Sequence, residues 1–379
     1  MTREEVNNLA LSKIDNTKCL ILELITGMGK TKIAIDLINH ICDRVFKEEE
    51  RPTSVLILVA KTVHKQVWQD EIKKWGGINS DYVVIECYES LHKYKKKGVG
   101  ILVLDECQHL SEARRNILET MFIYDNIIGL SATINRELKD YFKYSLKADF
   151  IKCGLKEAVE DDVLPEPTVY LLPLYLDTVK YAYKVKKFKR DIVTTQKGYY
   201  NNISSLVEWY RNKYFVSRNE RMKNLWLSTA GKRLKWLAEQ KEQTVKILLD
   251  KFKNYKTLTF CGSIEQSERL GKYNITSKNK DSIRNLEMFN SNKIKHITAC
   301  NILNEGVNLV NCRIGIFCNL NSSEIIVKQR VGRILRHKSP IIIIPYFKDT
   351  REEELVEKMT EEYNKDSVLS VENINSIKL

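Results

Sequence analysis

Proline and glycine are scarce in this chain, and long apolar runs are missing. Only 6 Pro and 15 Gly occur among 379 residues, which excludes a linker-rich or fibrous protein. No apolar run approaches the roughly 18 residues that a transmembrane helix needs, and the polar, acidic start MTREEVNN predicts no secretory signal. We therefore expect an intracellular protein, cytoplasmic or in a host cytoplasm if the source is viral, with no membrane partner.

Cysteine and histidine lack the spacing of a metal site. The nine cysteines include no C-x-x-C pair, and the six histidines show no ligand spacing. This pattern favours reduced thiols in the core over a disulfide framework or a zinc site. Hydrophobic residues make up 43% of the chain, enough to bury the cores of two or three domains. Trp68 and Trp75 are seven residues apart, on one helix face, and are expected in such a core.

Positive charge is concentrated in one segment. The chain carries 62 Lys and Arg against 49 Asp and Glu, a net charge of +13. The segment Tyr170–Lys256 holds 20 basic and 7 acidic residues, which is the whole excess, and 15 of the aromatic residues. Basic residues mixed with aromatic ones suit a polyanion with stackable bases. Amphipathic helices with solvated lysines around an aromatic core would give the same composition, so both interpretations stay open.

Apolar strands alternate with helical stretches in both halves of the chain. The first half predicts helices at Lys30–Phe46 and Val63–Lys74 and strands at Cys19–Leu24, Ser54–Ala60, Tyr82–Cys87, Gly100–Leu104 and Asn126–Leu130. A middle segment, about Leu174–Lys253, has helical periodicity. Strands then recur at Thr257–Phe260, His296–Thr298, Ile314–Cys318 and Pro340–Pro345, and a charged helix follows Lys348. This order predicts an α/β fold with two parallel sheets flanked by helices.

A glycine-containing loop follows the first strand and opens a helix. It reads Thr26-Gly27-Met28-Gly29-Lys30-Thr31. Glycines let the backbone point its N–H groups at phosphates, and the helix N-terminus adds partial positive charge. In such a loop Lys30 reaches the β- and γ-phosphates and the Thr31 hydroxyl holds Mg²⁺. Leu24 stands where the full pattern has its first glycine, and a glycine-rich turn without a ligand is the alternative.

Two further groups of charged residues carry chemistry. Asp105 and Glu106 follow the apolar run Ile101–Leu104, and the carboxyl end of a parallel strand is where ligands bind. We expect Asp105 to hold Mg²⁺ through water and Glu106 to activate the attacking water. Arg333 and Arg336 would share one face of a helix and suit the charge of a γ-phosphoryl group in transfer. Solvated loop carboxylates and a basic surface helix are the alternatives.

In this order the pieces resemble a superfamily 2 helicase or translocase of the DExH-like group, which includes phage UvsW-type helicases. The resemblance runs from about Leu20 to His337. Motifs I to VI of the family each have a counterpart in the chain. Motif I is matched by Thr26–Thr31, motif Ia by Val59–Trp75 and the T-Y-x-S-L contact by Tyr88–Leu91. Motifs II, III, IV, V and VI are matched, in that order, by Asp105–Gln108, Ser131–Thr133, Leu258–Ser263, Asn304–Asn308 and Gln329–Arg336.

The resemblance implies two RecA-like domains with ATP and Mg²⁺ between them. One domain would supply the phosphate loop, Asp105, Glu106 and Gln108. The other would supply the catalytic and nucleotide-binding residues Gln329, Arg333, Arg336, Gly306 and Asn308. Ser131 and Thr133 would couple the γ-phosphate to domain motion. Nucleic acid would lie against Lys61, Thr62, Tyr88 and Ser90.

The domain boundaries follow from the same comparison. We expect the first RecA-like domain at residues 1–155, a linker with a basic helical insertion at 156–229, and the second domain with a helical tail at 230–379. Leu164-Pro165 and Thr168–Leu172 resemble the exit from the first domain. The insertion would contact nucleic acid through Trp209 or Trp226 and through Lys184, Lys186, Lys187 and Lys189.

Departures from the family pattern bear on the substrate. No glutamine precedes Gln66, so a Q-motif that reads adenine is absent and selectivity for ATP over other nucleoside triphosphates stays open. Gln329 in place of a histidine, and Cys107-Gln108 after the acidic pair, favour DNA over RNA. The predicted function is ATP hydrolysis coupled to translocation, unwinding or branch remodelling. An RNA helicase, an ATP-gated clamp and a motor subunit of a restriction or defence complex are the alternatives.

Overall fold

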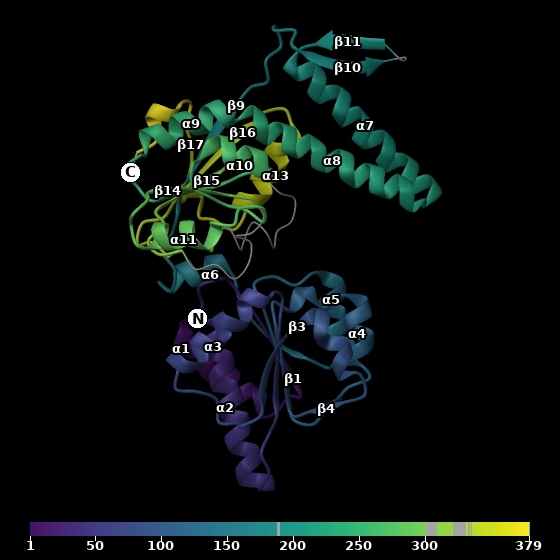
Figure 1. Ribbon diagram of the computed structural model, residues 1–379, viewed down its shortest axis with the longest axis vertical. Helices are drawn as coiled ribbons and strands as arrows, with labels where there is room; N and C mark the ends of the chain where they lie inside the picture. Colours follow the sequence, from purple (N-terminus) through teal and green to yellow (C-terminus); the bar gives the residue numbers. More distant parts are fainter. Residues whose placement is uncertain (188–189, 301–308, 321–330, 333, 335, 379) are drawn as a thin grey trace. The chain divides into compact units, whose positions relative to one another are not determined.

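The computed structural model describes residues 1–187, 190–300, 309–320, 331, 332, 334 and 336–378. These residues form two compact units. The first comprises Met1–Glu166 and the described residues among 324–336, and the second comprises the rest of the described chain. Each unit is built on a parallel sheet flanked by helices (Figure 1). Within the described ranges, no helix has both the length and the apolar character that crossing a membrane requires.

The sheet of the first unit has six parallel strands in the order β3-β2-β5-β7-β1-β8. They are β1 (Cys19–Leu24), β2 (Val55–Val59), β3 (Val83–Cys87), β5 (Ile101–Asp105), β7 (Ile127–Ser131) and β8 (Asp149–Cys153). The five strands that the sequence predicts here are confirmed. Asp105 lies level with Leu130, and Leu130 lies level with Leu22. The carboxyl ends of β5, β7 and β1 therefore meet at one edge of the sheet.

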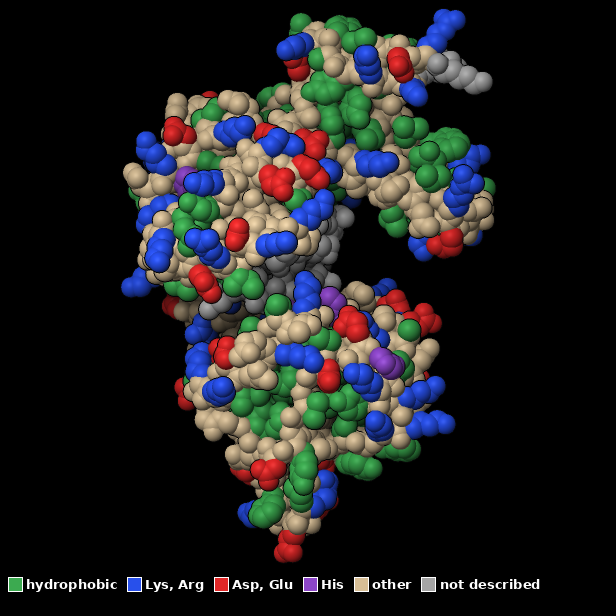
Figure 2. Space-filling view, in the orientation of Figure 1, with side chains coloured by type: hydrophobic (Ala, Val, Ile, Leu, Met, Phe, Trp, Pro, Cys, Tyr) green, Lys and Arg blue, Asp and Glu red, His purple; other side chains and the backbone are tan. Residues whose placement is uncertain are grey.

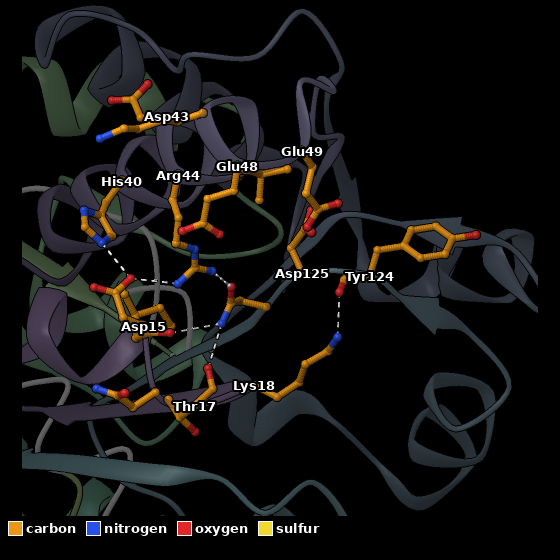
Figure 3. A pocket seen from close by; sticks show the side chains of 15 residues that line it. Asp15, Thr17, Lys18, His40, Asp43, Arg44, Glu48, Glu49, Tyr124 and Asp125 are labelled. Atoms are coloured by element: carbon orange, nitrogen blue, oxygen red, sulfur yellow. Dashed lines mark hydrogen bonds and ion pairs between the residues drawn. The ribbon is translucent and has the colours of Figure 1, made fainter.

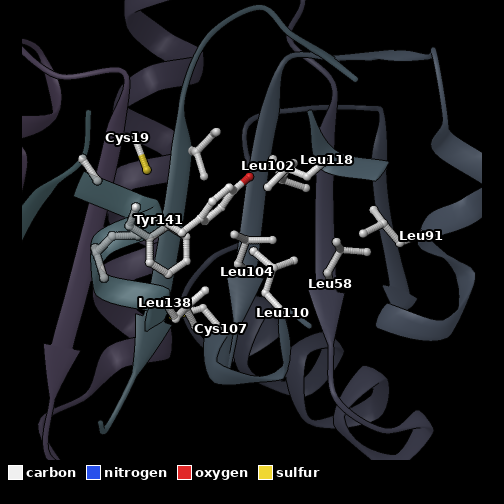
Figure 4. Close-up of a cluster of buried hydrophobic side chains, with 14 of the residues drawn as sticks. Cys19, Leu58, Leu91, Leu102, Leu104, Cys107, Leu110, Leu118, Leu138 and Tyr141 are labelled. Atoms are coloured by element: carbon white, nitrogen blue, oxygen red, sulfur yellow. The ribbon is translucent and has the colours of Figure 1, made fainter. Parts of the chain in front are cut away.

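Helices cover both faces of this sheet, which is why β1 and β2 are buried along their whole length. Figure 1 shows α1, α2 and α3 on one side and α4 and α5 on the other. The second side holds the core cluster of Figure 4, to which the sheet contributes Leu58, Leu102 and Leu104 and the helical segments contribute Leu118 and Tyr141. The elements are α1 (Arg3–Ile14), α2 (Lys30–Glu49), α3 (Thr62–Lys74), α4 (Glu112–Leu118), α5 (Arg136–Asp140), α6 (Leu155–Glu160) and the short pair β4 (Gly98–Val99) and β6 (Phe122–Ile123).

The second unit has a seven-stranded parallel sheet in the order β13-β14-β12-β15-β16-β9-β17. Its four predicted strands are confirmed, and its helices include the charged one expected after Lys348. Thr168–Leu172, expected as the exit from the first domain, lies within β9 and pairs with β16 in the second sheet. The elements are β9 (Thr168–Leu174), β12 (Thr257–Phe260), β13 (Asn274–Ile275), β14 (His296–Ala299), β15 (Ile314–Phe317), β16 (Ile341–Phe347), β17 (Val368–Ser370), α9 (Glu242–Lys251), α10 (Ile264–Leu270), α11 (Ser282–Asn290) and α13 (Arg351–Thr360).

Between β9 and α9 lies a projection that we call the arm. It consists of the antiparallel hairpin β10 (Tyr183–Lys187) and β11 (Arg190–Thr194), followed by the long helices α7 (Gln196–Ser217) and α8 (Glu220–Gln240). The expected helical periodicity is wrong for the start of this segment, because Lys184 and Lys186 lie on a strand. Apolar residues alternate with lysines there, which is the period of a strand. Helix α8 also runs through residues 229 and 230, where a domain boundary was expected.

A buried ion pair anchors the arm at its base. Lys241, between α8 and α9, donates to Glu352 of α13 over 2.6 Å, and both side chains are fully buried. Lys241 also donates to the carbonyl of Pro345 over 3.1 Å, and Glu352 accepts from the N–H of Phe347 over 3.0 Å. Because both charged groups are hydrogen-bonded as well as paired, their burial is tolerated.

Candidate active site

The phosphate loop leaves the buried end of β1 and turns into α2. Gly27 and Gly29 have φ angles of +104° and +85°, a region that residues with a Cβ rarely adopt. Gly29 is the residue before the first turn of α2, so the free N–H groups of that helix start at the loop. Lys30 donates to the carbonyl of Leu24 over 2.9 Å. The loop thus has the backbone shape that phosphate binding requires.

Asp105 ends strand β5 and is held by a residue that the sequence did not single out for this role. The indole N–H of Trp68 on α3 donates to Asp105 Oδ2 over 2.9 Å. Trp68 was expected in the core, and its side chain is 2% exposed. Trp75, expected to share that role, is instead 42% exposed at the end of the helix.

Burial and a neighbouring carboxylate disfavour the charged form of Asp105. Asp105 is half-buried, and the surrounding protein atoms keep water from its carboxylate. This loss of hydration raises the pKa of Asp105, and the nearby charge of Glu106 raises it further. The hydrogen bond from Trp68 and the charge of Lys30 oppose the shift. Carboxylate and hydroxyl oxygens, such as those of Asp105 and Thr31, are donors that fit Mg²⁺. A bound cation would bring the pKa of Asp105 down again.

Glu106 begins a chain of hydrogen bonds that reaches the end of β7. Its backbone has a φ of +50°, and its carboxylate accepts from Gln108 Nε2 over 2.8 Å. The Ser131 hydroxyl lies 2.6 Å from Gln108 Oε1 and 2.8 Å from the carbonyl of Thr133. The structure therefore brings together Glu106, Gln108, Ser131 and Thr133, as the resemblance implies.

Part of the predicted arginine segment belongs to the first unit. Gly332 lies so close to the phosphate loop that a Cβ built on it would be 2.4 Å from Thr26 Cβ. Arg336 lies in a turn, so the expected helical face does not extend to it. Nearby protein atoms lower the pKa of its guanidinium and the charge of Glu71 opposes that shift. The predicted residues Gln329, Arg333, Gly306 and Asn308 lie outside the described residues.

The residues expected to contact nucleic acid fall into two groups. Lys61 and Thr62, at the start of α3, are exposed, and Ser90 is half-buried. Tyr88 is 1% exposed, with the guanidinium of Arg114 lying 5.4 Å from the ring centre. The expectation that its side chain contacts nucleic acid is therefore wrong for this conformation, because the ring packs into the core.

Sequence reasoning also missed two residues beside the loop. Arg3 of α1 donates to the carbonyl of Gly27 over 3.0 Å. Glu23 of β1 is 9% exposed; it accepts from the N–H of Ile134 and pairs with Lys139 at 2.9 Å. A charged residue inside the apolar run of β1 was the signal available for Glu23. Arg3 gave none, because its contact depends on how α1 packs.

The cysteines behave as expected. All nine are free, and all except Cys87 are buried. Over the described residues there is no cluster of His, Cys, Asp and Glu that could hold a metal ion.

Figure 3 shows a polar pocket at the opposite, amino end of β1. Its charged groups satisfy one another: Asp15 lies 2.8 Å from His40 Nε2 and accepts from Arg44 over 2.7 Å. Arg44 also donates to Asn126, which in turn donates to the carbonyls of Ile14 and Thr17. These bonds tie α1, α2 and the start of β7 together, so the pocket has a structural role.

Two family models match the chain. The model described as "Type III restriction enzyme, res subunit" matches residues 2–136, and the "Helicase conserved C-terminal domain" matches residues 218–338. The chain belongs to superfamily 2 of the helicases. The two matches cover the phosphate loop, the acidic pair and the arginine segment of this chain.

Two relatives carry helicase or translocase names. IRC3 of Saccharomyces cerevisiae, named as an ATP-dependent helicase, is 24% identical over 345 residues, which are 84% of this chain and 46% of IRC3. The DNA 3'-5' translocase XPB2 of Sulfurisphaera tokodaii is 22% identical over 364 residues, 84% of this chain and 75% of XPB2. The helicase chain thus spans about half the length of IRC3.

The fold is that of solved relatives. A fragment of an HsdR subunit of a type I restriction enzyme from Vibrio vulnificus gives a TM-score of 0.63 at 18% identity, over 98% of this chain and 67% of that one. The helicase domain of Hef from Pyrococcus furiosus gives a TM-score of 0.52 at 13% identity, over 94% of this chain and 97% of that one. The two sheets are therefore RecA-like domains, as predicted. The finer resemblance to phage UvsW-type helicases stays a prediction.

Proposed function

We propose that this helicase couples ATP hydrolysis to movement along nucleic acid, with DNA favoured over RNA. One observation carries the proposal. The phosphate loop, the acidic pair and the hydroxyls after β7 meet at the carboxyl edge of one sheet, and Glu106 is linked to Ser131 through Gln108. A group that activates water is thereby connected to a neighbouring strand end, which is what coupling hydrolysis to motion requires.

Each residue has a proposed role in this site. Thr26–Thr31 bind the triphosphate, with Lys30 at the β- and γ-phosphates. Thr31 and Asp105 hold Mg²⁺, which neutralises phosphate charge when bound. Glu106 orients and deprotonates the attacking water, and Gln108 positions Glu106. Arg333 and Arg336 stabilise the charge on the γ-phosphoryl group, and Gln329 acts with them. Gly306 and Asn308 bind the nucleotide. An arginine of this kind contributes about 10³–10⁵ in rate in related enzymes.

Nucleic acid is proposed to bind along exposed polar and basic residues. Lys61, Thr62 and Ser90 lie near the first sheet. Lys184, Lys186 and Lys187 of the hairpin are proposed to add to this surface, as is Lys189, which lies outside the described residues. Lys184 and Lys186 are exposed and share one face of the hairpin, because residues two apart on a strand point the same way. Reversing charge on this hairpin is expected to weaken binding and to flatten its salt dependence, by about 0.9 for each phosphate group no longer neutralised on duplex DNA.

The test is multiple-turnover ATP hydrolysis measured without nucleic acid and with single-stranded, duplex and forked DNA and RNA. We expect DNA to stimulate hydrolysis most. Glu106→Gln should abolish turnover yet keep ATP-dependent nucleic-acid binding, since a general base contributes about 10²–10⁴. Stronger stimulation by RNA would establish the RNA helicase. Absence of hydrolysis in the unaltered protein would leave an ATP-gated clamp.

A second candidate is the motor subunit of a restriction or defence complex. It is favoured by the family match to a restriction res subunit and by the structural likeness to an HsdR fragment. The discriminating measurement is DNA cleavage by cells or by reconstituted complexes that contain this chain with its candidate partners. Cleavage that depends on Glu106 would support the motor subunit, and ATP hydrolysis with no partner requirement would favour the independent helicase.

A further inference from the structure

The free end of the arm carries an aromatic group that we call the tip cluster: Trp209, Tyr214, Phe215 and Trp226. Trp226 of α8 packs beside two rings of α7, with centroid distances of 6.1 Å to Tyr214 and 6.0 Å to Phe215. Arg218 ends α7 in the left-handed conformation, with a φ of +52°, and Asn219 caps α8. Tyr214, Phe215 and Trp226 therefore lie where the two helices turn back on each other, and Trp209 lies about two turns earlier on α7.

The tip lies well away from the core of its unit. Helix α8 is buried only at Leu237 and Ala238, and Glu220 precedes Leu237 by roughly 25 Å of helix at 1.5 Å per residue. At the base, by contrast, the rings of Tyr183, Tyr199 and Trp236 pack on one another. The aromatic-core interpretation of this segment holds at the base, and it does not explain the tip.

Large apolar side chains at the tip face solvent. Trp209 is 52% exposed, Phe215 47% and Val216 86%. Leu206, Trp209, Lys213 and Val216 are three or four residues apart, which places them on one face of α7. Its apolar members Leu206, Trp209 and Val216 are 43%, 52% and 86% exposed, and an exposed apolar patch of this kind indicates a binding surface. Figure 2 shows hydrophobic side chains beside Lys and Arg over α7 and α8.

The charged side chains around the tip indicate the chemistry of its binding partner. Its two carboxylates are already paired, Glu208 with Arg211 and Glu220 with Lys223, each at 3.3 Å. Lys213, Arg218 and Arg221 form no ion pair with a described carboxylate. Lys213 lies 5.8 Å from the ring centre of Trp209, and Arg218 lies 5.4 Å from that of Phe215. Exposed rings with cations beside them match bases with flanking phosphates.

We propose that the tip cluster binds single-stranded nucleic acid, with Trp209 and Phe215 stacked on bases and with Lys213, Arg218 and Arg221 on phosphates. This rests on the proposed function, because it adds a second contact for the same polymer. An unpaired strand is favoured over a duplex, whose base faces are closed except at its ends. The phosphates of a duplex would pair with the three basic side chains, but the apolar face would remain exposed to water.

The experiment measures binding of the full chain, without nucleotide, to a single-stranded oligonucleotide and to a blunt duplex of equal length by fluorescence anisotropy. A 2-aminopurine in the strand reports stacking. Trp209→Ala combined with Phe215→Ala should weaken single-strand binding about 10-fold or more and abolish the stacking signal, with little change in the salt slope. Replacing Lys213, Arg218 and Arg221 by Gln should lower that slope by about 0.7 for each phosphate group no longer neutralised.

Phe46→Ala is the matched control, since Phe46 is a ring 66% exposed on α2 of the first unit. It should bind as the unaltered protein does. Circular dichroism checks that each variant folds. Unchanged single-strand binding by the Trp209 and Phe215 variant would overturn the inference and leave the face to a protein partner. In that case DNA would still stimulate ATP hydrolysis, so the proposed function would stand. Absence of ATP hydrolysis in the unaltered protein would instead refute the proposed function, whatever the binding measurements give.

Discussion

The indole N–H of Trp68 donates to Asp105 Oδ2 over 2.9 Å, which joins α3 to the end of the strand that carries the acidic pair. This bond occupies Oδ2, so Oδ1 is the oxygen that would hold the proposed Mg²⁺ or its bound water. Trp68→Phe keeps an aromatic ring but removes the donor. A hydrogen bond to a charged group is worth about 1.5–3 kcal/mol, so we expect the Mg²⁺ requirement for hydrolysis to rise about 10-fold or more.

The measurement is ATP hydrolysis across a Mg²⁺ titration, with Mn²⁺ binding followed by electron paramagnetic resonance as a readout independent of turnover. Trp75→Phe is the control. The Trp75 indole also donates to a carboxylate, Glu71 Oε2 at 2.7 Å, but on an exposed ring. Equal metal requirements in the two variants would show that Trp68 only fills space.

Gly332 has no room for a side chain beside the phosphate loop. A Cβ there would lie 2.4 Å from Thr26 Cβ, closer than two carbons can approach, so Gly332→Ala must shift the arginine segment or the loop. Misplacement by about 1 Å can cost about 100-fold in rate. We expect kcat for ATP hydrolysis to fall by about 10–100-fold.

Gly231→Ala is the control for that substitution. A Cβ on Gly231, in α8, would meet no atom within 4 Å, and alanine is the better helix former by about 1 kcal/mol. We expect unchanged hydrolysis and a small gain in stability. Normal kcat in Gly332→Ala would mean that the segment does not need its close approach to Thr26.

The buried pair Lys241 and Glu352 makes a stability prediction. Lys241→Met leaves a fully buried carboxylate without its counter-charge, which typically costs about 3–5 kcal/mol. Adding Glu352→Gln removes the charge and keeps an acceptor for the N–H of Phe347, so much of the loss should be recovered. Urea unfolding of the two variants gives the free energies. A single variant as stable as the unaltered protein would show that the pair contributes nothing net.

Acid should reduce the contribution to folding stability that Asp15 makes in the polar pocket of Figure 3. Burial by itself would raise the pKa of Asp15, but hydrogen bonds and charges from His40 and Arg44 outweigh it and hold the pKa below its ordinary value. The unfolded chain then binds the proton more readily, so this contribution is complete above about pH 5 and fades as pH falls below about 4 through the folded pKa. Asp15→Asn should show a shallower loss of stability at low pH in urea titrations, and curves parallel to the unaltered protein would refute this.

Local patterns predicted much of the fold and part of the site. The predicted strands of both sheets need only a run of apolar residues, and Gly27 and Gly29 mark a turn that other residues rarely adopt. Asp105 was placed correctly because a parallel strand delivers its last residue to the ligand edge. The lysine-rich start of the arm misled the helix prediction, since the stretch YAYKVKKFKR has a mixed period that suits a helix or a strand, and here Tyr183–Lys187 pairs with β11.

The amino-acid sequence by itself determined the phosphate loop, the acidic pair and the concentration of charge, because each depends on residues adjacent in the chain. Only the tertiary structure decided which aromatic side chains are buried and which carboxylate accepts a hydrogen bond. The sequence predicted the same buried helix face for Trp68 and Trp75, yet one is 2% exposed and the other 42%. The reason is that burial and hydrogen bonding depend on elements brought together from distant parts of the chain, as when Trp68 of α3 reaches Asp105 of β5.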